Sequence, residues 1–318
     1  MTSRALIVGS GGQDGTLLFD LLVAKGYEVI GLTRNVVMSS TGNWTGLGFD
    51  ITNFRAVSDF IQILQPNEVY FLAAHHHSSQ DYCGDEEIIT RESIAINHGA
   101  LVGFLEAIRL CSPKSRLFYA ASSHIFGDPA EELQDENTSI NPITIYGITK
   151  ASGLFTCRRY RQIYGIFASA GILYNHESPL RSKSFLSKKI TTGVAMIKRG
   201  ELSKIKIGDL NIRVDWGYAP DYVRAMHQVL NIDTPEDFII STGVTHSVRE
   251  FVDLAFKAAG LDYLAHMDID ASMMQRTAYG LAGNPAKLMN KTGWRPTLTF
   301  SEMVNKLVNF ELGERDEK

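Results

Sequence analysis

The sequence is poor in cysteine and contains no tract of basic residues. Its three cysteines, Cys83, Cys111 and Cys157, form no Cys-x-x-Cys pair. We therefore expect neither a disulfide framework nor a cysteine-based zinc site, and reduced thiols are typical of a cytoplasmic protein. Lysine and arginine together number 31 against 35 acidic residues. This balance argues against a nucleic-acid surface and against a polybasic membrane contact, so small-molecule partners are expected.

Long apolar stretches are also lacking. We find no charged leader, no apolar signal core and no uninterrupted run of about 20 apolar residues, so no membrane segment is expected. The first residues lead directly into the strand-like segment 5–8. With 318 residues and 44% hydrophobic content, the chain suits one large α/β unit or a main domain with a smaller lobe.

A strand, a glycine-rich turn and a helix are predicted at the N-terminus. The apolar segment Ala5-Leu6-Ile7-Val8 is followed by Gly9-Ser10-Gly11-Gly12-Gln13-Asp14-Gly15 and then by an amphipathic run that ends at Lys25-Gly26. Glycines at 9, 12 and 15 allow a tight turn, close approach of a pyrophosphate and close helix–strand packing. The alternative is an ordinary glycine loop. The pattern favours a dinucleotide site that includes Gly9, Gly12, Gln13, Asp14 and Gly15.

The end of the second predicted strand, 28–32, indicates which dinucleotide is bound. Sites that prefer NAD usually carry an acid here to bind the ribose 2′-hydroxyl, whereas this chain has Arg34. Arg34 therefore points to NADP, with NAD less favoured. Asp50 follows the next apolar stretch and is a candidate adenine contact. The alternative is that Asp50 caps a helix beside Thr52 and Asn53.

Three consecutive histidines follow the third predicted strand, 69–72, and the pair Ala73-Ala74. Adjacent side chains diverge, and no cysteine or carboxylate stands at ligand spacing, so a metal site is not expected. Ligands bind at the carboxyl ends of parallel strands. Ala73 is therefore a candidate cofactor contact, and His76 is a candidate pocket residue.

Tyr146 and Lys150 stand at the head of an apolar run that is compatible with a helix. Four residues apart, they lie one turn from each other on a single face, so the ammonium can sit beside the phenol. Holding a phenol of pKa ~10 as phenolate near neutrality requires a shift of about 3 units, or roughly 4 kcal/mol, which a cation and an oxidised nicotinamide can supply jointly. The pattern alone also occurs on exposed helix faces. Its context is a predicted strand, 117–121, that ends in Ser122-Ser123-His124.

In this order, the motifs resemble those of extended short-chain dehydrogenases/reductases. Further blocks are similar, more narrowly, to the GDP-mannose 4,6-dehydratase family. These blocks are Gly12-Gln13-Asp14-Gly15, Glu68-Val69-Tyr70 with Leu72-Ala73-Ala74, Asn175-His176-Glu177-Ser178-Pro179, Asp215-Trp216-Gly217 with Asp221-Tyr222-Val223, and Gly283-Asn284-Pro285 through Gly293-Trp294. The resemblance runs from the first strand almost to the end of the chain, and the Asn-His-Glu-Ser-Pro block is its most specific part.

The resemblance implies an α/β fold: a Rossmann-type doubly wound parallel sheet with a smaller C-terminal lobe. We expect an NADP-binding domain over residues 1–174 and a nucleotide-sugar-binding lobe mainly over 175–318, with segments that can return to the main sheet. The second part is predicted to contain helices at 184–197, 219–230, 248–259 and from 300, and strands at 204–207 and 238–241. The family also pairs helices into a four-helix interface, which implies a homodimer or homotetramer.

The implied activity is that of an NADP-dependent nucleotide-sugar 4,6-dehydratase with a GDP-mannose-like substrate. Tyr146 then accepts the proton of the sugar 4-hydroxyl, Lys150 supports the phenolate and the cofactor ribose, and Ser122 bonds the 4-oxygen. Further alternatives are a nucleotide 4-keto-sugar reductase, an epimerase, or a non-catalytic NADP-binding sensor on the same fold.

Three candidate substrate contacts are carried over from the family by position. Asn175 and Lys189 match positions that contact the nucleotide sugar, and Arg276 resembles a late arginine that reaches the diphosphate. For Lys189, the alternative is a solvated helix face that it shares with Lys183 and Lys188.

The chain departs from the family at three positions. His124 stands where the dehydratases have a glutamate, and it is a candidate base for the C5 proton. His76 stands where the family has a serine. Val214 replaces a diphosphate-binding arginine, which leaves Arg213 one position early and, in a strand, on the opposite face.

Overall fold

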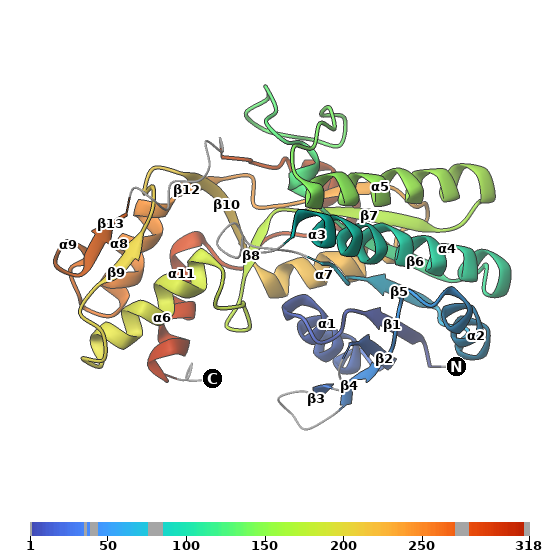
Figure 1. Ribbon diagram of the computed structural model, residues 1–318, viewed down its shortest axis with the longest axis horizontal. Helices are drawn as coiled ribbons and strands as arrows, with labels where there is room; N and C mark the ends of the chain where they lie inside the picture. Colours follow the sequence, from blue (N-terminus) through green and yellow to red (C-terminus); the bar gives the residue numbers. More distant parts are fainter. Residues whose placement is uncertain (1, 35–36, 39–43, 76–84, 271–279, 315–318) are drawn as a thin grey trace.

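The main body of the molecule is built around an eight-stranded sheet (Figure 1). The computed structural model describes residues 2–34, 37–38, 44–75, 85–270 and 280–314. The strand order is β11-β7-β6-β5-β1-β2-β4-β3. All neighbours pair in parallel except β3, which is antiparallel to β4. The strands are β1 Arg4–Val8, β2 Glu28–Thr33, β3 Val37–Met38, β4 Trp44–Gly48, β5 Glu68–Phe71, β6 Arg116–Ser122, β7 Ala168–Leu173 and β11 Asp237–Ile240. The predicted Rossmann-type parallel sheet is confirmed.

Helices cover both faces of this sheet, as the nearly continuous apolar strands require. In β1, Leu6 and Val8 face one hydrophobic core, whereas Ala5 and Ile7 face the other. The first core is closed by α2 (Phe54–Leu64), α4 (Ala100–Cys111) and α5 (Ile145–Tyr164). The second is closed by α1 (Gln13–Ala24), α7 (Ala219–Leu230) and α10 (Ala286–Thr292).

One continuous helical run, Glu86–Cys111, packs against the main sheet. It consists of α3 (Glu86–Ser93), a π-helix (Ile94–Gly99) and α4. Within the described residues it is the run whose length and composition alone would allow it to cross a membrane. Polar residues such as Asn97, His98 and Glu106 interrupt the run, so it is not a continuous apolar stretch, and the absence of a membrane segment stays a prediction. Leu101, Phe104 and Leu105 are fully buried against the sheet, which explains the apolar content of the run.

A smaller lobe contains a separate core and two short sheets. One sheet has the order β12-β10-β8, and the other pairs β13 with β9. Its strands are β8 Asn175–Glu177, β9 Ile205–Ile207, β10 Arg213–Tyr218, β12 Thr245–Ser247 and β13 Met267–Ile269. Its helices are α6 Leu186–Lys198, α8 Val248–Ala258, α9 Tyr263–His266 and α11 Phe300–Leu312. Figure 1 shows the lobe beside the carboxyl ends of the main strands, where β8 joins the two parts.

Capping side chains define where the lobe helices begin. Ser247 and Glu250 form a capping box at the start of α8, and Thr299 and Glu302 form another at α11. The helices predicted at 184–197, 219–230 and 248–259 are confirmed within two residues at each end. Helix α7 packs on the main body and not on the lobe. Strand β11 also belongs to the main body, where it forms the edge of the main sheet beside β7.

Candidate functional site

The glycine turn between β1 and α1 has the close contacts that its sequence requires. Gly9 has a φ of +96°, and a Cβ there would lie 2.7 Å from the backbone nitrogen of Ala73. A Cβ on Gly15 would lie 2.4 Å from the Gly9 carbonyl oxygen, whereas at Gly12 the nearest atom would be 3.6 Å away. Helix α1 begins after Gly12 without a capping side chain among the described residues. Its first N–H groups therefore suit an anion such as a pyrophosphate.

Arg34 and Asp50 lie just after the ends of strands β2 and β4. Arg34 directly follows β2 and is exposed. Asp50 is also exposed, and its Oδ1 accepts hydrogen bonds from the backbone nitrogen (2.9 Å) and the hydroxyl (2.6 Å) of Thr52. These bonds lower the pKa of Asp50. The N-cap of α2 is Asn53, which accepts from the nitrogen of Ala56 at 3.1 Å. Asp50 therefore shapes the preceding turn and is not the cap.

Lys150 and Tyr146 share one face of α5. The Lys150 nitrogen lies 5.6 Å from the centroid of the Tyr146 ring and donates to the Ala120 carbonyl at 2.8 Å. Lys150 is only 1% exposed, and burial lowers its pKa to about 7. Thr144 caps the helix through the nitrogen of Gly147, which places Tyr146 in the first turn. The Tyr146 phenol and the Lys150 amine therefore lie close together, as their spacing in the sequence predicts.

The phenol of Tyr146 is not ionised by these neighbours alone. Burial raises the pKa of Tyr146 to about 12, while a hydrogen bond from Ser122 and the positive charge of Arg181 lower it. A functioning phenolate therefore needs additional positive charge, such as an oxidised nicotinamide. The site has the groups for a proton acceptor but requires a ligand to complete it.

Ser122 and His124 reach the same place from the end of β6. Ser122 is the last residue of the strand, and its Oγ accepts from the backbone nitrogen of His124 at 3.3 Å. A short 3-10 turn, Ser123–Ile125, then directs the His124 ring toward α5. The ring centroids of His124 and Tyr146 are 5.7 Å apart, with the planes at 87°. The three predicted groups Ser122, His124 and Tyr146 are thus brought together.

Arg181 is a charged residue of this site that the sequence reasoning missed. Its Nε lies 3.2 Å from Glu177 Oε2, and its guanidinium carbon lies 3.6 Å from the centroid of the Phe185 ring. Its charge lowers the pKa of both Tyr146 and Asp14. The available signal was its position, two residues after the Asn-His-Glu-Ser-Pro block.

Asn97 links the strand that ends before His75 to the helix that carries Lys150. It is fully buried in the π-helix. Its side chain accepts from the nitrogen of His75 (2.6 Å) and donates to the His75 carbonyl (3.1 Å) and to Thr149 Oγ1 (3.0 Å). The π-helical distortion, often found at functional sites, lets one amide hold both segments.

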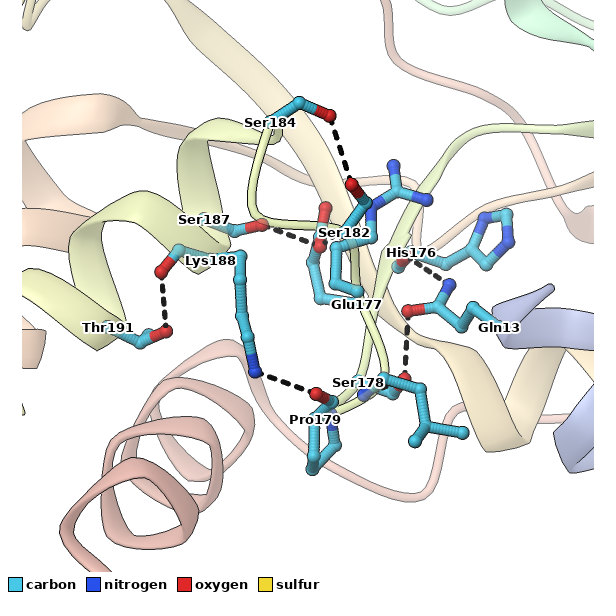
Figure 2. Close-up of polar contacts among 12 residues, drawn as sticks. Gln13, His176, Glu177, Ser178, Pro179, Ser182, Ser184, Ser187, Lys188 and Thr191 are labelled. Carbon is cyan, nitrogen blue, oxygen red and sulfur yellow. Dashed lines mark hydrogen bonds and ion pairs between the residues drawn. The ribbon is translucent and has the colours of Figure 1, made fainter. Parts of the chain in front are cut away.

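Gln13 connects the glycine turn to the block that contains His176 and Ser178 (Figure 2). Asp14 Oδ2 lies 2.9 Å from His176 Nε2. Burial disfavours the charged imidazole, but the Asp14 carboxylate outweighs this effect and raises the pKa of His176. Gln13 and Asp14 were predicted as cofactor contacts. The structure shows that these two residues also join the main body to the lobe.

The predicted contacts Asn175 and Lys189 lie in the lobe. Asn175 is exposed at the start of β8, opposite Trp216 of β10. Lys189 is half-buried on α6. It lines a cavity of about 310 Å³ together with Lys183, Lys188, Lys204 and Lys206. Lys188 also forms an ion pair with Glu311, so it is not part of a solvated face.

Arg213 is held against the neighbouring strand β12. It is exposed, and its guanidinium donates to the hydroxyl (3.1 Å) and the carbonyl (2.6 Å) of Thr245. Val214, the next residue, packs against the lobe core, so the two side chains take opposite faces of β10. The candidates His76 and Arg276 lie outside the described residues. Within the described parts of the chain, no cluster of three or more His, Cys, Asp or Glu side chains is placed to bind a metal.

Comparisons with known proteins agree with this arrangement. A family model described as GDP-mannose 4,6 dehydratase matches residues 6–307. GDP-mannose 4,6 dehydratase 2 of Caenorhabditis elegans is 34% identical over 337 residues, which covers 96% of this chain and 87% of that protein.

Solved structures show the same fold at lower identity. RMD from Pseudomonas aeruginosa complexed with NADPH is similar with a TM-score of 0.82 and 19% identity, over 99% of this chain and 100% of that chain. The dTDP-glucose 4,6-dehydratase from Bacillus anthracis has a TM-score of 0.81 and 18% identity, over 97% and 96%. From the family match and the curated relative, the chain belongs to the GDP-mannose 4,6-dehydratase family and is a nucleotide-sugar dehydratase of the extended short-chain dehydrogenase/reductase type.

Proposed function

We propose that the protein is an NADP-dependent 4,6-dehydratase that acts on GDP-mannose or a closely similar nucleotide sugar. The observation that carries this proposal is the grouping of Ser122, His124 and Tyr146 around the buried amine of Lys150. The names of the curated relatives support the substrate class.

The glycine turn fits the proposed cofactor. Gly9 and Gly15 are fixed by close backbone contacts, while the open side of Gly12 and the uncapped start of α1 leave room for a pyrophosphate. The exposed guanidinium of Arg34 suits a ribose 2′-phosphate, and the P. aeruginosa neighbour is complexed with NADPH. Bound at the glycine turn and Arg34, NADP would supply the reversible hydride transfer that the proposed reaction requires. Gln13, Asp14, Asp50 and Ala73 are proposed as further contacts.

Tyr146 is proposed to accept the proton of the sugar 4-hydroxyl. Its pKa of about 12 falls when positive charge approaches the ring, because burial is what disfavours the phenolate. Lys150 supplies such a charge from one turn away once it is protonated, and Ser122 donates a hydrogen bond to the 4-oxygen. Together these groups stabilise the alkoxide-like oxygen from which the ketone forms.

His124 is proposed to perform the elimination. The 4-ketone acidifies the C5 proton, and the His124 imidazole removes it while the bond from C6 to its hydroxyl breaks. The same imidazolium then gives its proton to the leaving hydroxide, so that one water is released and the base is restored. An imidazole with an ordinary pKa of about 6.5 can act in both directions near neutrality.

The nucleotide is proposed to lie on the lobe. Asn175 begins β8 and is exposed, and Lys189 lines the lysine-rich cavity on α6. Ammonium groups suit a diphosphate, and Arg276 and Arg213 are further candidate contacts. His76 is proposed to line the sugar pocket.

A homodimer is proposed as the assembled form, with a homotetramer as the larger alternative. Ile88, Ile94, Ile148 and Phe155 on α3, the π-helix and α5 expose 54%, 51%, 45% and 50% of their surface. Such apolar side chains on paired helices are suited to a second copy of the chain. Light scattering at micromolar concentration tests this, and a monomer would contradict it. A cytoplasmic location is proposed from the reduced thiols expected of the sequence.

Incubation with NADP and GDP-mannose in deuterated water tests the catalytic proposal. The expected product is a 4-keto-6-deoxy sugar with solvent deuterium at C5, because the original C5 proton leaves with the released water and C5 takes a new one from solvent when the hydride adds to C6. His124→Ala should stop the elimination yet allow slow oxidation at C4, which accumulated NADPH would report. If no nucleotide hexose is dehydrated but a supplied 4-keto sugar consumes NADPH, the protein is a reductase. Stereochemical inversion without loss of water would indicate an epimerase.

A further inference from the structure

His176 lies where the lobe meets the glycine turn, and both of its ring nitrogens face acceptors. Nδ1 lies 2.7 Å from the Tyr174 carbonyl oxygen, and Nε2 lies 2.9 Å from Asp14 Oδ2. A carbonyl oxygen accepts hydrogen bonds but cannot donate them, and the same holds for an ionised carboxylate. A neutral imidazole carries a proton on one nitrogen alone, so it would satisfy only one of these contacts. The two contacts together therefore require an imidazolium.

The Asp14 carboxyl is ionised in this arrangement. Burial acts to raise its pKa, but the charge of His176 and hydrogen bonds from His176 and Gln13 bring the pKa below its ordinary value. Gln13 Nε2 donates to Asp14 Oδ1 at 3.1 Å and also to the His176 carbonyl at 3.1 Å (Figure 2). Each oxygen of the carboxylate thus has a donor from the protein, and the one on Oδ2 is His176.

Charged and titratable groups face the His176 ring from three other segments. Asp14 comes from α1, Arg181 from the loop between β8 and α6, and Tyr222 from α7. His176 is 7% exposed, and its ring stacks on Tyr222 with centroids 4.5 Å apart and planes at 19°. Burial and the charge of Arg181 both oppose the imidazolium, yet Arg181 has a carboxylate of its own, Glu177, at 3.2 Å. Each cation is paired with one carboxylate, and the partner of Asp14 is His176.

The position of Asp14 explains why its charge needs compensation. It is the second residue of α1, in the first turn of the helix whose N–H groups are proposed to bind a pyrophosphate. Negative charge at this end of a helix interacts favourably with the helix dipole but repels a bound anion. Asp14 keeps 20% of its side chain exposed, so its charge is only partly shielded from a ligand there. An ionised Asp14 without a partner would therefore compete with the cofactor for the start of the helix.

We propose that His176, as an imidazolium, is a positioning residue that orients and neutralises the Asp14 carboxylate and so leaves the start of α1 available to the pyrophosphate of the cofactor. This inference rests on the proposed cofactor site at the glycine turn. A residue of the lobe then governs cofactor affinity through Asp14. NADP and NAD share the pyrophosphate, so both depend on His176 equally, in contrast to the 2′-phosphate contact proposed for Arg34.

The protonation state of His176 is measured first, without cofactor, by NMR of protein whose histidines carry an NMR-active nitrogen isotope. An imidazolium should show a directly bonded proton on both ring nitrogens near pH 7. In Asp14→Asn the carboxylate is gone, so burial and Arg181 act without opposition and the ring should lose one proton. A ring with a single proton in the parent protein would overturn the proposal.

Cofactor affinity is then compared by calorimetry in His176→Gln, Asp14→Asn and the double variant. Glutamine keeps a hydrogen-bond donor for Asp14 but carries no charge. At low salt His176→Gln should bind NADP and NAD about tenfold more weakly than the parent protein, because Asp14 is left uncompensated. Raising the salt concentration should shrink this loss. Asp14→Asn and the double variant should bind at least as tightly as the parent, because they have no carboxylate to neutralise.

His227→Gln is the matched control. It removes an imidazole at the amino end of the main sheet that lies 3.2 Å from the Tyr27 oxygen, and burial lowers the pKa of His227 to about 4, so no charge is lost. Its affinity for both cofactors should equal that of the parent protein. A loss in His176→Gln that the double variant fails to restore would show a merely structural role and overturn the proposal. Unchanged affinity in His176→Gln, or an equal loss in His227→Gln, would do the same.

Failure of the proposed cofactor site would give a different result. The parent protein would then bind neither NADP nor NAD, and the inference would fail with the site. Normal binding by the parent without rescue in the double variant would refute the inference alone. If His176→Gln does not fold, the NMR spectrum of Asp14→Asn decides: loss of one proton from the His176 ring supports the pairing, and two retained protons overturn it.

Discussion

The two ends of the main sheet both bury ionisable groups, but they differ in how these groups are partnered. At the amino end, Glu68 accepts hydrogen bonds from the phenols of Tyr70 (2.6 Å) and Tyr27 (3.0 Å). Burial raises the pKa of Glu68, although both phenols act to lower it. His227 lies 3.2 Å from the Tyr27 oxygen, and burial lowers its pKa to about 4, so it is neutral at pH 7.

At the carboxyl end the buried amine and phenol have uncharged hydrogen-bond partners. In the described chain, the hydrogen bond from Lys150 Nζ goes to the Ala120 carbonyl and not to a carboxylate. Burial lowers the pKa of Lys150 to about 7 and raises that of Tyr146 to about 12, so both groups resist the charged form. The charge of a bound ligand would therefore shift the pKa of both groups. The comparison shows that a buried carboxylate bonded to two phenols makes a structural unit, whereas a buried amine and phenol bonded to neutral groups keep a protonation that the charge of a ligand can change.

The largest effect that distinguishes the two ends is expected from removal of one phenol oxygen at each. Tyr146→Phe should lower turnover by about 1,000-fold or more, because it removes the proton acceptor at C4 while the ring volume remains. Tyr70→Phe should keep turnover but lower the free energy of unfolding by about 1–3 kcal/mol, because Glu68 loses a buried partner. Steady-state kinetics and denaturant unfolding measure the two quantities.

Cofactor binding by Tyr146→Phe serves as the control for an intact site, since the substitution leaves the glycine turn untouched. Full turnover in Tyr146→Phe would mean that the proton acceptor is another group. Loss of turnover in folded Tyr70→Phe would mean that the amino-end cluster also participates in catalysis.

The catalytic end was predictable from sequence where its residues are close along the chain. Tyr146 and Lys150 share a helical face because of their spacing, and Ser122 follows an apolar strand that must end near a ligand site. Gly9 and Gly15 were predicted because only glycine fits those backbone contacts. These signals are local, so one sequence is enough to find them.

Contacts between distant segments were not predictable in the same way. The loop after β8 is linked to the glycine turn because the Ser178 hydroxyl donates to Gln13, 165 positions earlier, and no periodicity encodes such a pair. Lys188 and Lys189 are adjacent and chemically alike, yet Lys188 is taken by Glu311 near the end of the chain. Both lysines line the cavity, and which of them pairs with Glu311 depends on the packing of α6 against α11, which a single sequence does not specify.

The next largest effect concerns stability against pH, where the two ends should have opposite signs. The folded-state pKa of Lys150, about 7, lies below its ordinary value of 10.5, so the unfolded chain binds more protons between these values. Stability should therefore rise with pH across this window, by up to about 1.4 kcal/mol per unit. For Glu68 the folded pKa lies above the ordinary 4.5. Its contribution is full below pH 4.5 and is lost as pH rises through the folded pKa.

Urea unfolding of the cofactor-free protein, repeated across pH, measures both slopes. Lys150→Met should remove the rise above about pH 7 and leave the acidic side unchanged. Glu68→Gln should do the reverse. An unchanged rise in Lys150→Met would show that another group titrates in that window, and the contrast between the two ends would fail.

The smallest effect is expected from two arginines at opposite ends of the β1–β2 pair. Arg4 is matched at the amino end by Glu28, with its Nε 2.9 Å from Oε2, whereas Arg34 is exposed beyond the carboxyl end of β2. Arg34→Ala should weaken NADP binding by about tenfold and leave NAD binding unchanged, because only NADP carries the 2′-phosphate. Arg4→Ala should alter neither affinity, since its partner belongs to the protein. Calorimetric titration of both cofactors measures this, and an NADP preference that survives Arg34→Ala would place the phosphate contact elsewhere.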